Sequence, residues 1–198
     1  PERFQKAKRG LLKDGRFSKT SREIRTIPGS PVAYWVGDKT IAAFRDQPDL
    51  KSNYEVRSGI MTGNDSKFLR NWHEVGLSEI EFGLSNSRQM TKKFFPMSKG
   101  GSFRRWYGNQ GHIINLWNNA EDIKSSGLNY ALRDDRLYFR PFVTWSRITS
   151  SNVGFRFNPT GVLFSDAGPG IFAEENCERV IALANSKVAT HFLNSLNP

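Results

Sequence analysis

The stretch Gly111-His112-Ile113-Ile114-Asn115-Leu116-Trp117 indicates the fold more directly than any other part of the sequence. It is a short apolar run that starts after a glycine and ends at polar residues, which is the pattern of a buried strand. Similar runs, several of them aromatic, predict further strands at 56–65, 137–145, 153–157 and 161–164. Among them, Pro141 favours a sheet edge or an irregularity, because proline cannot donate a hydrogen bond to a neighbouring strand.

Helical spacing is clearest at the end of the chain. Between Cys177 and Leu196 apolar residues recur every three or four positions, which predicts one amphipathic helix with room for a kink near Asn185-Ser186. Shorter helices are predicted at 38–46, capped by Asp38, and in the turn and helix at 118–124. The sequence therefore predicts a mixed α/β (α+β) fold, with a curved, irregular sheet of short strands and a C-terminal amphipathic helix.

Three further segments have weaker signals. The turn Pro28-Gly29-Ser30-Pro31 is followed by 32–36, which is apolar enough to begin a packed element. Residues 67–72 fit either a helix or a second strand, and 72–75 resemble a strand edge. The segment Asp166–Gly170 is interpreted as a structural turn, and Phe172 as a core residue.

Composition narrows the class of protein. The 198 residues (22.5 kDa) suffice for one domain with a hydrophobic core and a small appendage. A mean hydropathy of −0.55 without a long apolar run excludes a transmembrane helix. One cysteine, Cys177, excludes an internal disulfide and fits a reducing cytoplasm, and the histidines lack metal-ligand spacing. Because the chain starts at Pro1 without Met or an apolar signal, we expect it to be part of a longer polypeptide.

Positive charge points to the class of partner. The net charge of +10 and the pI of about 9.9 favour nucleic acid or anionic membranes. Basic residues gather in 1–27, interpreted as a solvated tail or connecting helix, and again in 88–105. The C-terminal part is locally acidic, so the positive field covers only part of the molecule.

The segment 96–109 carries the strongest functional signal, because it joins paired glycines to adjacent arginines and aromatic residues. Glycines allow a close backbone approach, and arginine presents a fixed fork of donors to guanine or phosphate. We expect Trp106 to lie in the core and the Tyr107 hydroxyl to reach a phosphate. The alternative is a hairpin turn with solvated arginines. The candidate contact residues are Lys92, Lys93, Lys99, Gly100, Gly101, Arg104, Arg105 and Tyr107.

Two other loops supply further candidates. Thr62 and Asn64, with Asp65, follow a predicted strand, where they would meet phosphates or adenine edges, or merely cap their own turn. After Trp145, hydroxyl groups and arginines suit phosphate contact, and Arg156 would extend that surface. The candidates in this second loop are Arg147, Ser150, Ser151 and Arg156.

Motifs of catalysis are missing from the sequence. It has no phosphate-binding NTPase loop, no dinucleotide fingerprint and no Asn/Asp-Pro-Pro-aromatic motif of the kind that holds a flipped adenine in amino-methyltransferases. Asp134-Asp135 lacks the strand that a metal-dependent nuclease needs, and Ser186 and His191 lack a partner acid. We therefore expect neither catalysis nor a metal site within these residues.

Several stretches, taken in order, resemble one family. They resemble the target-recognition region of adenine-specific DNA methyltransferases of the PglX type, from bacterial phage-defence (BREX) systems. Type IIG restriction-modification enzymes and the TaqI-like specificity domain look related. The resemblance covers nearly everything from Ile27 onward. The stretches that carry it are 27–35, 58–65, 68–75, 92–109, 144–151, 166–172 and 184–189.

The resemblance implies a division of labour. In such proteins an upstream methyltransferase domain carries S-adenosylmethionine and the catalytic motif, so no cofactor is expected within these residues. Residues 1–27 would be the trailing edge of that domain or a linker, and 28–198 the DNA target-recognition domain, with related sequences continuing past Pro198. The implied partners are double-stranded DNA, the upstream methyltransferase domain, and other defence-system subunits or a phage DNA-mimic inhibitor, but no membrane.

Two alternatives of other classes remain open from the sequence. The chain would be a nuclease domain of a restriction enzyme if Asp134, Asp135 and Asp166 seeded a carboxylate cluster. Alternatively, its basic face would serve as a protein-interaction module for an acidic, DNA-mimicking partner.

Overall fold

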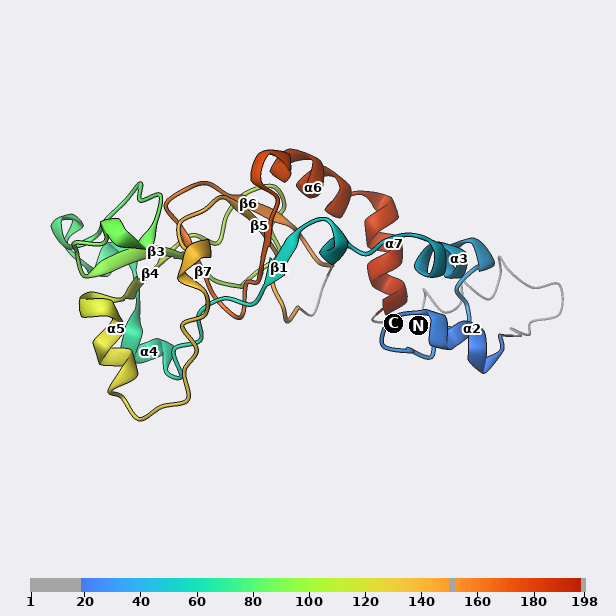
Figure 1. The fold of residues 1–198 in the computed structure, drawn as a ribbon, viewed down its shortest axis with the longest axis horizontal. Helices are drawn as coiled ribbons and strands as arrows, with labels where there is room; N and C mark the ends of the chain where they lie inside the picture. The colour runs from blue at the N-terminus through green and yellow to red at the C-terminus, as the bar shows by residue number, and fades with distance from the viewer. Residues whose placement is uncertain (1–18, 150–151, 197–198) are drawn as a thin grey trace. The chain divides into compact units, whose positions relative to one another are not determined.

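The computed structural model describes residues 19–149 and 152–196, and these residues divide into two units (Figure 1). The terminal unit comprises the described residues of 1–52 and 186–198, and the central unit those of 53–185. The elements of the terminal unit are α2 (Ser21–Thr26), α3 (Asp38–Asp46), a 3-10 turn (Leu50–Ser52) and α7 (Lys187–Leu196).

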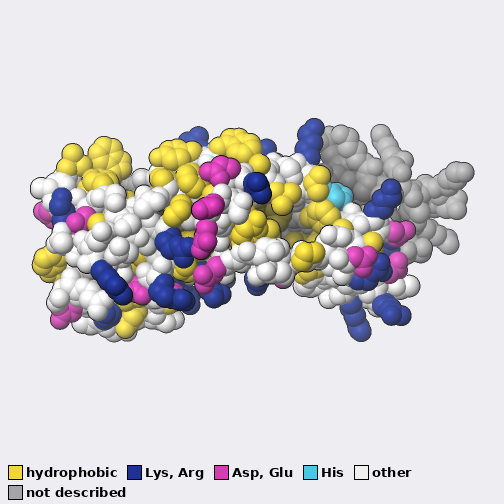
Figure 2. Space-filling model, turned by 45° about the horizontal axis from the view of Figure 1, so that its top comes forward, with side chains coloured by type: hydrophobic (Ala, Val, Ile, Leu, Met, Phe, Trp, Pro, Cys, Tyr) yellow, Lys and Arg dark blue, Asp and Glu magenta, His cyan; other side chains and the backbone are white. Residues whose placement is uncertain are grey.

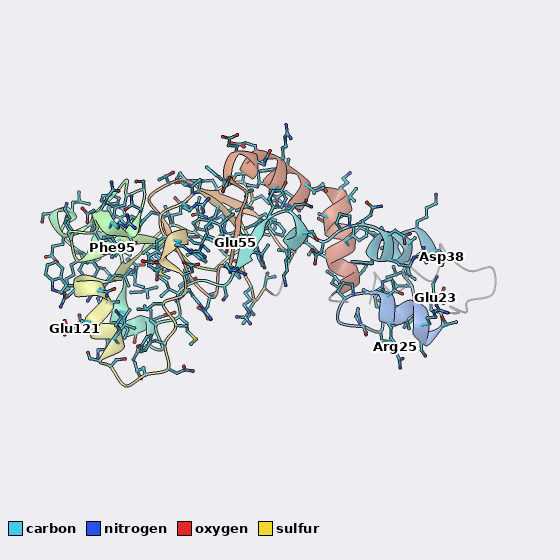
Figure 3. The ribbon with its side chains drawn as sticks, viewed as in Figure 1. Glu23, Arg25, Asp38, Glu55, Phe95 and Glu121 are labelled. Carbon is cyan, nitrogen blue, oxygen red and sulfur yellow. The ribbon has the colours of Figure 1, made fainter. Side chains whose placement is uncertain are left out.

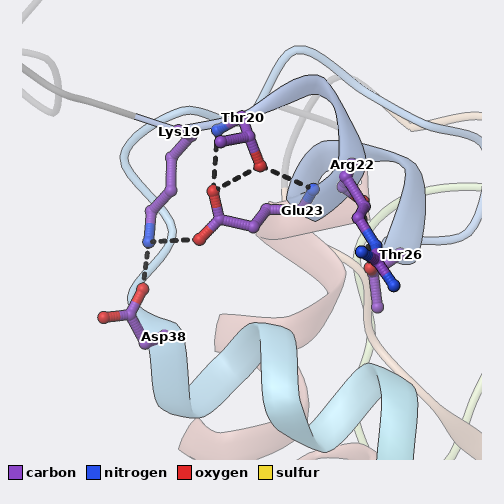
Figure 4. Close-up of polar contacts among 6 residues, drawn as sticks. All are labelled: Lys19, Thr20, Arg22, Glu23, Thr26 and Asp38. Carbon is purple, nitrogen blue, oxygen red and sulfur yellow. Dashed lines mark hydrogen bonds and ion pairs between the residues drawn. The ribbon is translucent and has the colours of Figure 1, made fainter.

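The terminal unit begins with a tightly capped helix. At the start of α2, the backbone N–H of Thr20 donates to the Glu23 carboxylate at 2.7 Å, and the Thr20 hydroxyl accepts from the Glu23 N–H at 3.3 Å. Lys19 forms ion pairs with Glu23 and with Asp38 at the first turn of α3 (Figure 4). This reciprocal capping satisfies two backbone donors that a short helix otherwise leaves unpaired.

The core of the terminal unit contains the segment that the sequence predicted to pack. Ala33 and Val36 are buried together with Ile27 and Ile41, and Leu196 of α7 packs against them. The predicted helix at 38–46 is confirmed with these bounds, but the predicted cap is wrong. Gly37 is the N-cap, and Asp38 is the first helical residue, where its charge favours the helix dipole.

The central unit contains two four-stranded sheets. The first has the order β1-β8-β5-β6 with every pair antiparallel, and the second has the order β2-β4-β3-β7 with β3 and β7 parallel. The strands of the first sheet are β1 (Glu55–Arg57), β8 (Gly170–Phe172), β5 (Phe142–Thr144) and β6 (Arg156–Asn158). Those of the second are β2 (Leu69–Asn71), β4 (His112–Asn115), β3 (Phe94–Ser98) and β7 (Leu163–Phe164).

Short helices and 3-10 turns connect these strands. Within the central unit, α6 packs against β5 and β6 of the first sheet. The helices are α4 (Asp65–Phe68), α5 (Trp117–Lys124) and α6 (Cys177–Ala184). The 3-10 turns are Trp72–Glu74, Leu77–Glu79, Ser87–Gln89, Asp135–Leu137 and Glu174–Asn176. No helix in the described parts of the chain is both long and apolar enough to cross a membrane.

Aromatic and aliphatic side chains fill the core of the central unit. Phe95 on β3, labelled in Figure 3, is fully buried with Ile114 of β4 and Phe139. Beside the first sheet, Phe142, Phe164 and Phe172 pack with ring centroids 5.1–5.7 Å apart. Such clusters bury a large apolar area, which is the main favourable term in folding.

The predicted mixed α/β class is confirmed. Of the strand predicted at 111–117, His112–Asn115 form β4, and the helix expected after it is α5. The strands form two sheets, however, not one curved sheet. The strand edge predicted at 72–75 is wrong, because Trp72–Glu74 form a 3-10 turn, and β3 and β8 were not predicted. Pro141 directly precedes β5, which is an interior strand of the first sheet. The interpretation of Pro141 as a sheet-edge residue is therefore wrong, and it lies instead in the irregular segment before the strand.

The predicted C-terminal helix exists as two helices that meet at the predicted kink. The α6 helix ends at Ala184 and α7 begins at Lys187. The Asn185 side chain bonds both backbone groups of Phe155, accepting from its N–H at 3.0 Å and donating to its carbonyl at 2.9 Å. These bonds hold Asn185 to the strand beside it, so the chain turns there and does not continue as a helix.

Candidate nucleic-acid interface

Residues 99–111, which connect β3 to β4, form the candidate contact loop, here called the arginine loop. Near its start, Ser146 Oγ accepts from the Gly101 N–H at 3.1 Å and donates to the Gly101 carbonyl at 2.9 Å. Near its end, Gln110 donates to the Asn158 side chain at 2.8 Å. The start of the loop is therefore fastened to the segment that follows β5, and its end is fastened to β6.

The middle of the arginine loop lies along the edge of the first sheet. The Trp106 N–H donates to the Phe155 carbonyl at 3.0 Å, and the Trp106 carbonyl accepts from Phe157 at 2.9 Å. This parallel bridge lies on the open side of β6, so the loop adds one residue of a further strand there. A polar side chain carried by this loop is thus held on a rigid element, which suits a binding site.

Both adjacent arginines are exposed on this loop. The Arg105 guanidinium lies over the Phe103 ring, with its carbon 5.4 Å from the ring centroid. The aliphatic part of Arg104 lies beside Gly108, where a Cβ added to the glycine would be 3.4 Å from Arg104 Cγ. None of the ion pairs among the described residues includes Arg104 or Arg105, and both remain available to a polyanion.

Trp106 and Tyr107 lie at the surface of the arginine loop. Trp106 is 55% exposed and Tyr107 61%, so the expectation that Trp106 belongs to the core is wrong. The core beside the first sheet is already filled by Phe142, Phe164 and Phe172. The backbone of Trp106 forms the bridge to β6. Gly108 and Asn109 follow it with positive φ, and such residues indicate the apex of a loop.

The paired glycines have packing roles in the structure. A Cβ added to Gly100 would lie 2.6 Å from the Ala167 carbonyl oxygen, and Gly101 has a φ of +143° that other residues rarely adopt. Arg147, an exposed residue, donates its backbone N–H to the same Ala167 carbonyl at 3.0 Å. Arg147 therefore lies beside the base of the arginine loop, a proximity that the sequence did not predict. Ser150 and Ser151 lie outside the described residues.

Lys99 meets the other predicted loop. Its Nζ lies 2.6 Å from an Asp65 carboxylate oxygen, and the Thr62 hydroxyl donates to the other oxygen at 2.7 Å. Thr62 is buried, so the structure does not place it on a contact surface, whereas Asn64 caps α4 by accepting from the Lys67 N–H. Sequence reasoning missed the role of Asp65, which neutralises part of the charge assigned to Lys99.

The electrostatics of this cluster favour an ionised Asp65. Burial raises the pKa of the Asp65 carboxyl, but hydrogen bonds from Lys99 and Thr62 outweigh it, so the pKa lies below its usual value. Burial lowers the pKa of His112 nearby, and the positive charge of Lys99 lowers it further. At neutral pH the cluster thus contains the Lys99 ammonium, paired with Asp65, and a largely neutral His112 imidazole.

We expect Asp65→Asn to lower the melting temperature by about 1–4 °C at pH 7, because it weakens a partly exposed ion pair. Because the pKa of Asp65 is lower in the folded chain than in the unfolded chain (about 3.9), the ionised carboxylate stabilises the fold at any pH above that value. This stabilisation is lost as the pH falls through the pKa of Asp65 in the folded chain. The difference should therefore vanish in strong acid, and Lys99→Met should behave likewise. Thermal melts from pH 7 to pH 2 test this, and equal stability at pH 7 would contradict it.

The two lysines upstream of the loop differ in their contacts. Lys92 is half-buried, and its ammonium donates to the Ile80 carbonyl at 3.1 Å. Lys93 is exposed, with its nitrogen 5.5 Å from the centroid of the Phe94 ring. From Phe82 to Ala120 the sequence has no acidic residue, so these lysines and the arginine loop share one segment whose only charged side chains are basic.

Arg156 is where the structure departs furthest from the predicted site. It was expected to extend the surface near Arg147, but it is only 1% exposed. Its Nη1 lies 3.4 Å from Ser146 Oγ, and its Nε and Nη2 have no partner among the described residues. Burial lowers the pKa of the guanidinium. Arg156 thus lies beneath the arginine loop, where its contact to Ser146 makes it a positioning residue.

The central unit displays a mixed surface. On the face drawn in Figure 2, lysine and arginine side chains lie between several separate groups of hydrophobic ones. Exposed aromatic residues of the central unit include Trp72, Phe82, Phe103, Trp106, Tyr107 and Trp117. A surface that combines cations with aromatic side chains is typical of nucleic-acid contact.

Residues that would support catalysis have other partners. Arg136 Nε lies 3.0 Å from both Asp134 carboxylate oxygens, and the Ser87 hydroxyl donates to Asp135 at 3.2 Å. In the terminal unit, His191 hydrogen-bonds Thr40 at 3.0 Å. Among the described residues, no group of three or more His, Cys, Asp or Glu side chains could hold a metal ion.

Comparison with known proteins gives the class of relatives. No family model matches the chain. Its curated relatives are adenine-specific methyltransferases. Adenine-specific methyltransferase PglX of Lacticaseibacillus casei (strain Zhang) is 38% identical over 186 residues, which cover 87% of this chain and 15% of that protein. Adenine-specific methyltransferase BrxX of Escherichia coli O9:H4 (strain HS) is 33% identical over 181 residues, covering 89% of this chain and 14% of that protein.

These figures confirm the PglX part of the resemblance that the sequence motifs indicated. The chain spans only about 15% of the length of the curated relatives that it matches. Nearly all of this chain is therefore homologous to one short part of a much longer adenine-specific methyltransferase.

Proposed function

We propose that this chain is a target-recognition module, which binds double-stranded DNA and selects the site at which an adenine-specific methyltransferase acts. The observation that carries the proposal is the arginine loop, a rigidly fastened loop whose two exposed arginines have no acidic partner among the described residues. Phosphate contacts would set its position on the duplex, and contacts to base edges would select the sequence.

The proposal assigns chemistry to other parts of the polypeptide. The relatives are named for methyl transfer to adenine, and this chain matches 14–15% of them. We place S-adenosylmethionine and the catalytic residues outside these 198 residues, in a bacterial phage-defence or restriction-modification enzyme. The nuclease alternative is not favoured, because Asp134 is paired with Arg136 and Asp135 accepts from Ser87.

Salt dependence tests the proposal. If Arg104, Arg105 and Arg147 each displace one counterion, the dissociation constant for a duplex should rise roughly 40-fold between about 50 and 200 mM salt. Arg147→Ala should reduce the slope of log K against log salt by about 1. Lys124→Ala, an exposed charge on α5, is the matched control and should leave the slope unchanged.

Fluorescence anisotropy with a labelled duplex provides both measurements. A dissociation constant that is the same at low and physiological salt would contradict the proposal. An unlabelled acidic DNA-mimic protein that competes with the duplex would show that both partners use one surface. Binding of that protein alone, without any duplex binding, would favour the protein-interaction alternative instead.

A further inference from the structure

Trp106 presents an unusually large apolar surface to solvent from a backbone that is held in place. Its side chain is 55% exposed, and its neighbours Phe103 and Tyr107 are 45% and 61% exposed. Exposed aromatic surface is costly to leave in water and commonly marks a binding site. The arginine loop thus carries three exposed aromatic residues, Phe103, Trp106 and Tyr107, here called the aromatic group.

The backbone conformation of Trp106 sets it apart from an ordinary exposed aromatic residue. Its φ of +74° lies in the left-handed region, where a bulky side chain is an outlier. Hydrogen bonds from its N–H to Phe155 and from Phe157 to its carbonyl hold the backbone there. Strained positions that the surrounding structure maintains are concentrated at functional sites, where they point a side chain at a ligand.

The charges next to the aromatic group indicate the chemistry of that ligand. Arg104 and Arg105 directly precede Trp106, and the acid-free segment 82–120 surrounds it in sequence. An apolar protein groove would not complement these cations. A base pair step does, because it offers flat aromatic faces between two phosphate strands, and aromatic side chains stack on bases of any identity.

We infer that Trp106 inserts its ring into the base stack of the bound duplex, between two neighbouring base pairs. This inference rests on the proposed function, since it presupposes that the arginine loop meets duplex DNA. Arg104 holds a phosphate beside the opened step, Arg105 faces the edge of a neighbouring base, and the indole occupies the step. The insertion costs unstacking energy, so a step that is already open should bind more tightly than an intact one.

A pair of duplexes tests this inference with the full 198-residue chain. One duplex is intact, and the other has the same sequence with one abasic position. We expect the unsubstituted chain to prefer the abasic duplex, and Trp106→Ala to lose about 5- to 150-fold in affinity for it. The preference should also disappear in Trp106→Ala. Trp106→Phe should retain part of the preference, because phenylalanine still stacks.

Controls separate the inference from the proposed function. Tyr130→Ala removes an aromatic residue that is 38% exposed and lies outside the arginine loop, and it should keep both affinities. Circular dichroism identifies any variant that fails to fold, in which case Trp106→Phe decides. If the Trp106 variants bind both duplexes as the unsubstituted chain does, the inference is wrong and the proposed function stands. If the unsubstituted chain binds neither duplex, both are wrong.

Discussion

Replacing Gly154 by alanine is expected to displace the arginine loop and to abolish specific DNA binding. Gly154 is buried beside β6, and a Cβ built there would overlap the Arg104 carbonyl oxygen and approach Phe103. Backbone atoms cannot move aside as the end of a flexible side chain can, so the loop must leave the sheet edge. The Trp106 hydrogen bonds to Phe155 and Phe157 would then be lost.

The expected loss of stability for Gly154→Ala is about 2–4 kcal/mol, which corresponds to a fall of about 5–15 °C in melting temperature. Gly111→Ala is the matched control in the same loop, because a Cβ there meets nothing within 4 Å. Thermal melts and duplex-binding anisotropy should show a large loss for Gly154→Ala and little change for Gly111→Ala. Equal behaviour of the two variants would contradict this packing of the loop against Gly154.

The sequence predicted those parts of the fold in which local preference and tertiary packing agree. The strand at 111–117 and the helix at 38–46 have patterns that match their final environment. The strand β3 was not predicted, because its last residues, 96–98, were interpreted as part of the functional segment 96–109. In the structure β3 pairs with β4 and β7 on either side, and those partners lie far away in sequence. Pairings of this kind cannot be inferred from local pattern.

The candidate site stays a prediction, and the structure shows only which of its side chains reach the surface. Arg104, Arg105 and Arg147 are exposed, as a contact role requires, but the proximity of Arg147 to the base of the arginine loop was not predicted. Arg156 and Trp106 exchange their expected positions, with the cation buried and the aromatic ring exposed. Residue type alone predicts the opposite, since arginine is rarely buried without a partner. The sheet-edge bridge at Trp106, a long-range contact, decides which of the two faces solvent.

The structure also suggests how the two adjacent arginines divide their work. Arg105 lies over the Phe103 ring, which orients the plane of its guanidinium while its donor edges stay open. An oriented fork is suited to bidentate contact with guanine, worth about 1–3 kcal/mol of discrimination against the wrong base. Arg104 has no such stacking partner among the described residues and would act mainly as a charge for phosphate. We therefore expect Arg105 to read a base and Arg104 to hold the backbone.

Lysine substitutions separate these roles, because lysine keeps the charge but loses the planar fork. Arg105→Lys should reduce the preference for the selected sequence about 5- to 150-fold while retaining most non-specific binding. Phe103→Leu should have a similar but smaller effect, since it removes the ring that orients Arg105. Arg104→Lys should change little, and Arg104→Ala should weaken binding to all sequences and lower the salt slope by about 1. Selection from a random duplex pool gives the preferred sequence for each variant. An unchanged selected sequence for Arg105→Lys, together with a changed one for Arg104→Lys, would reverse the assignment.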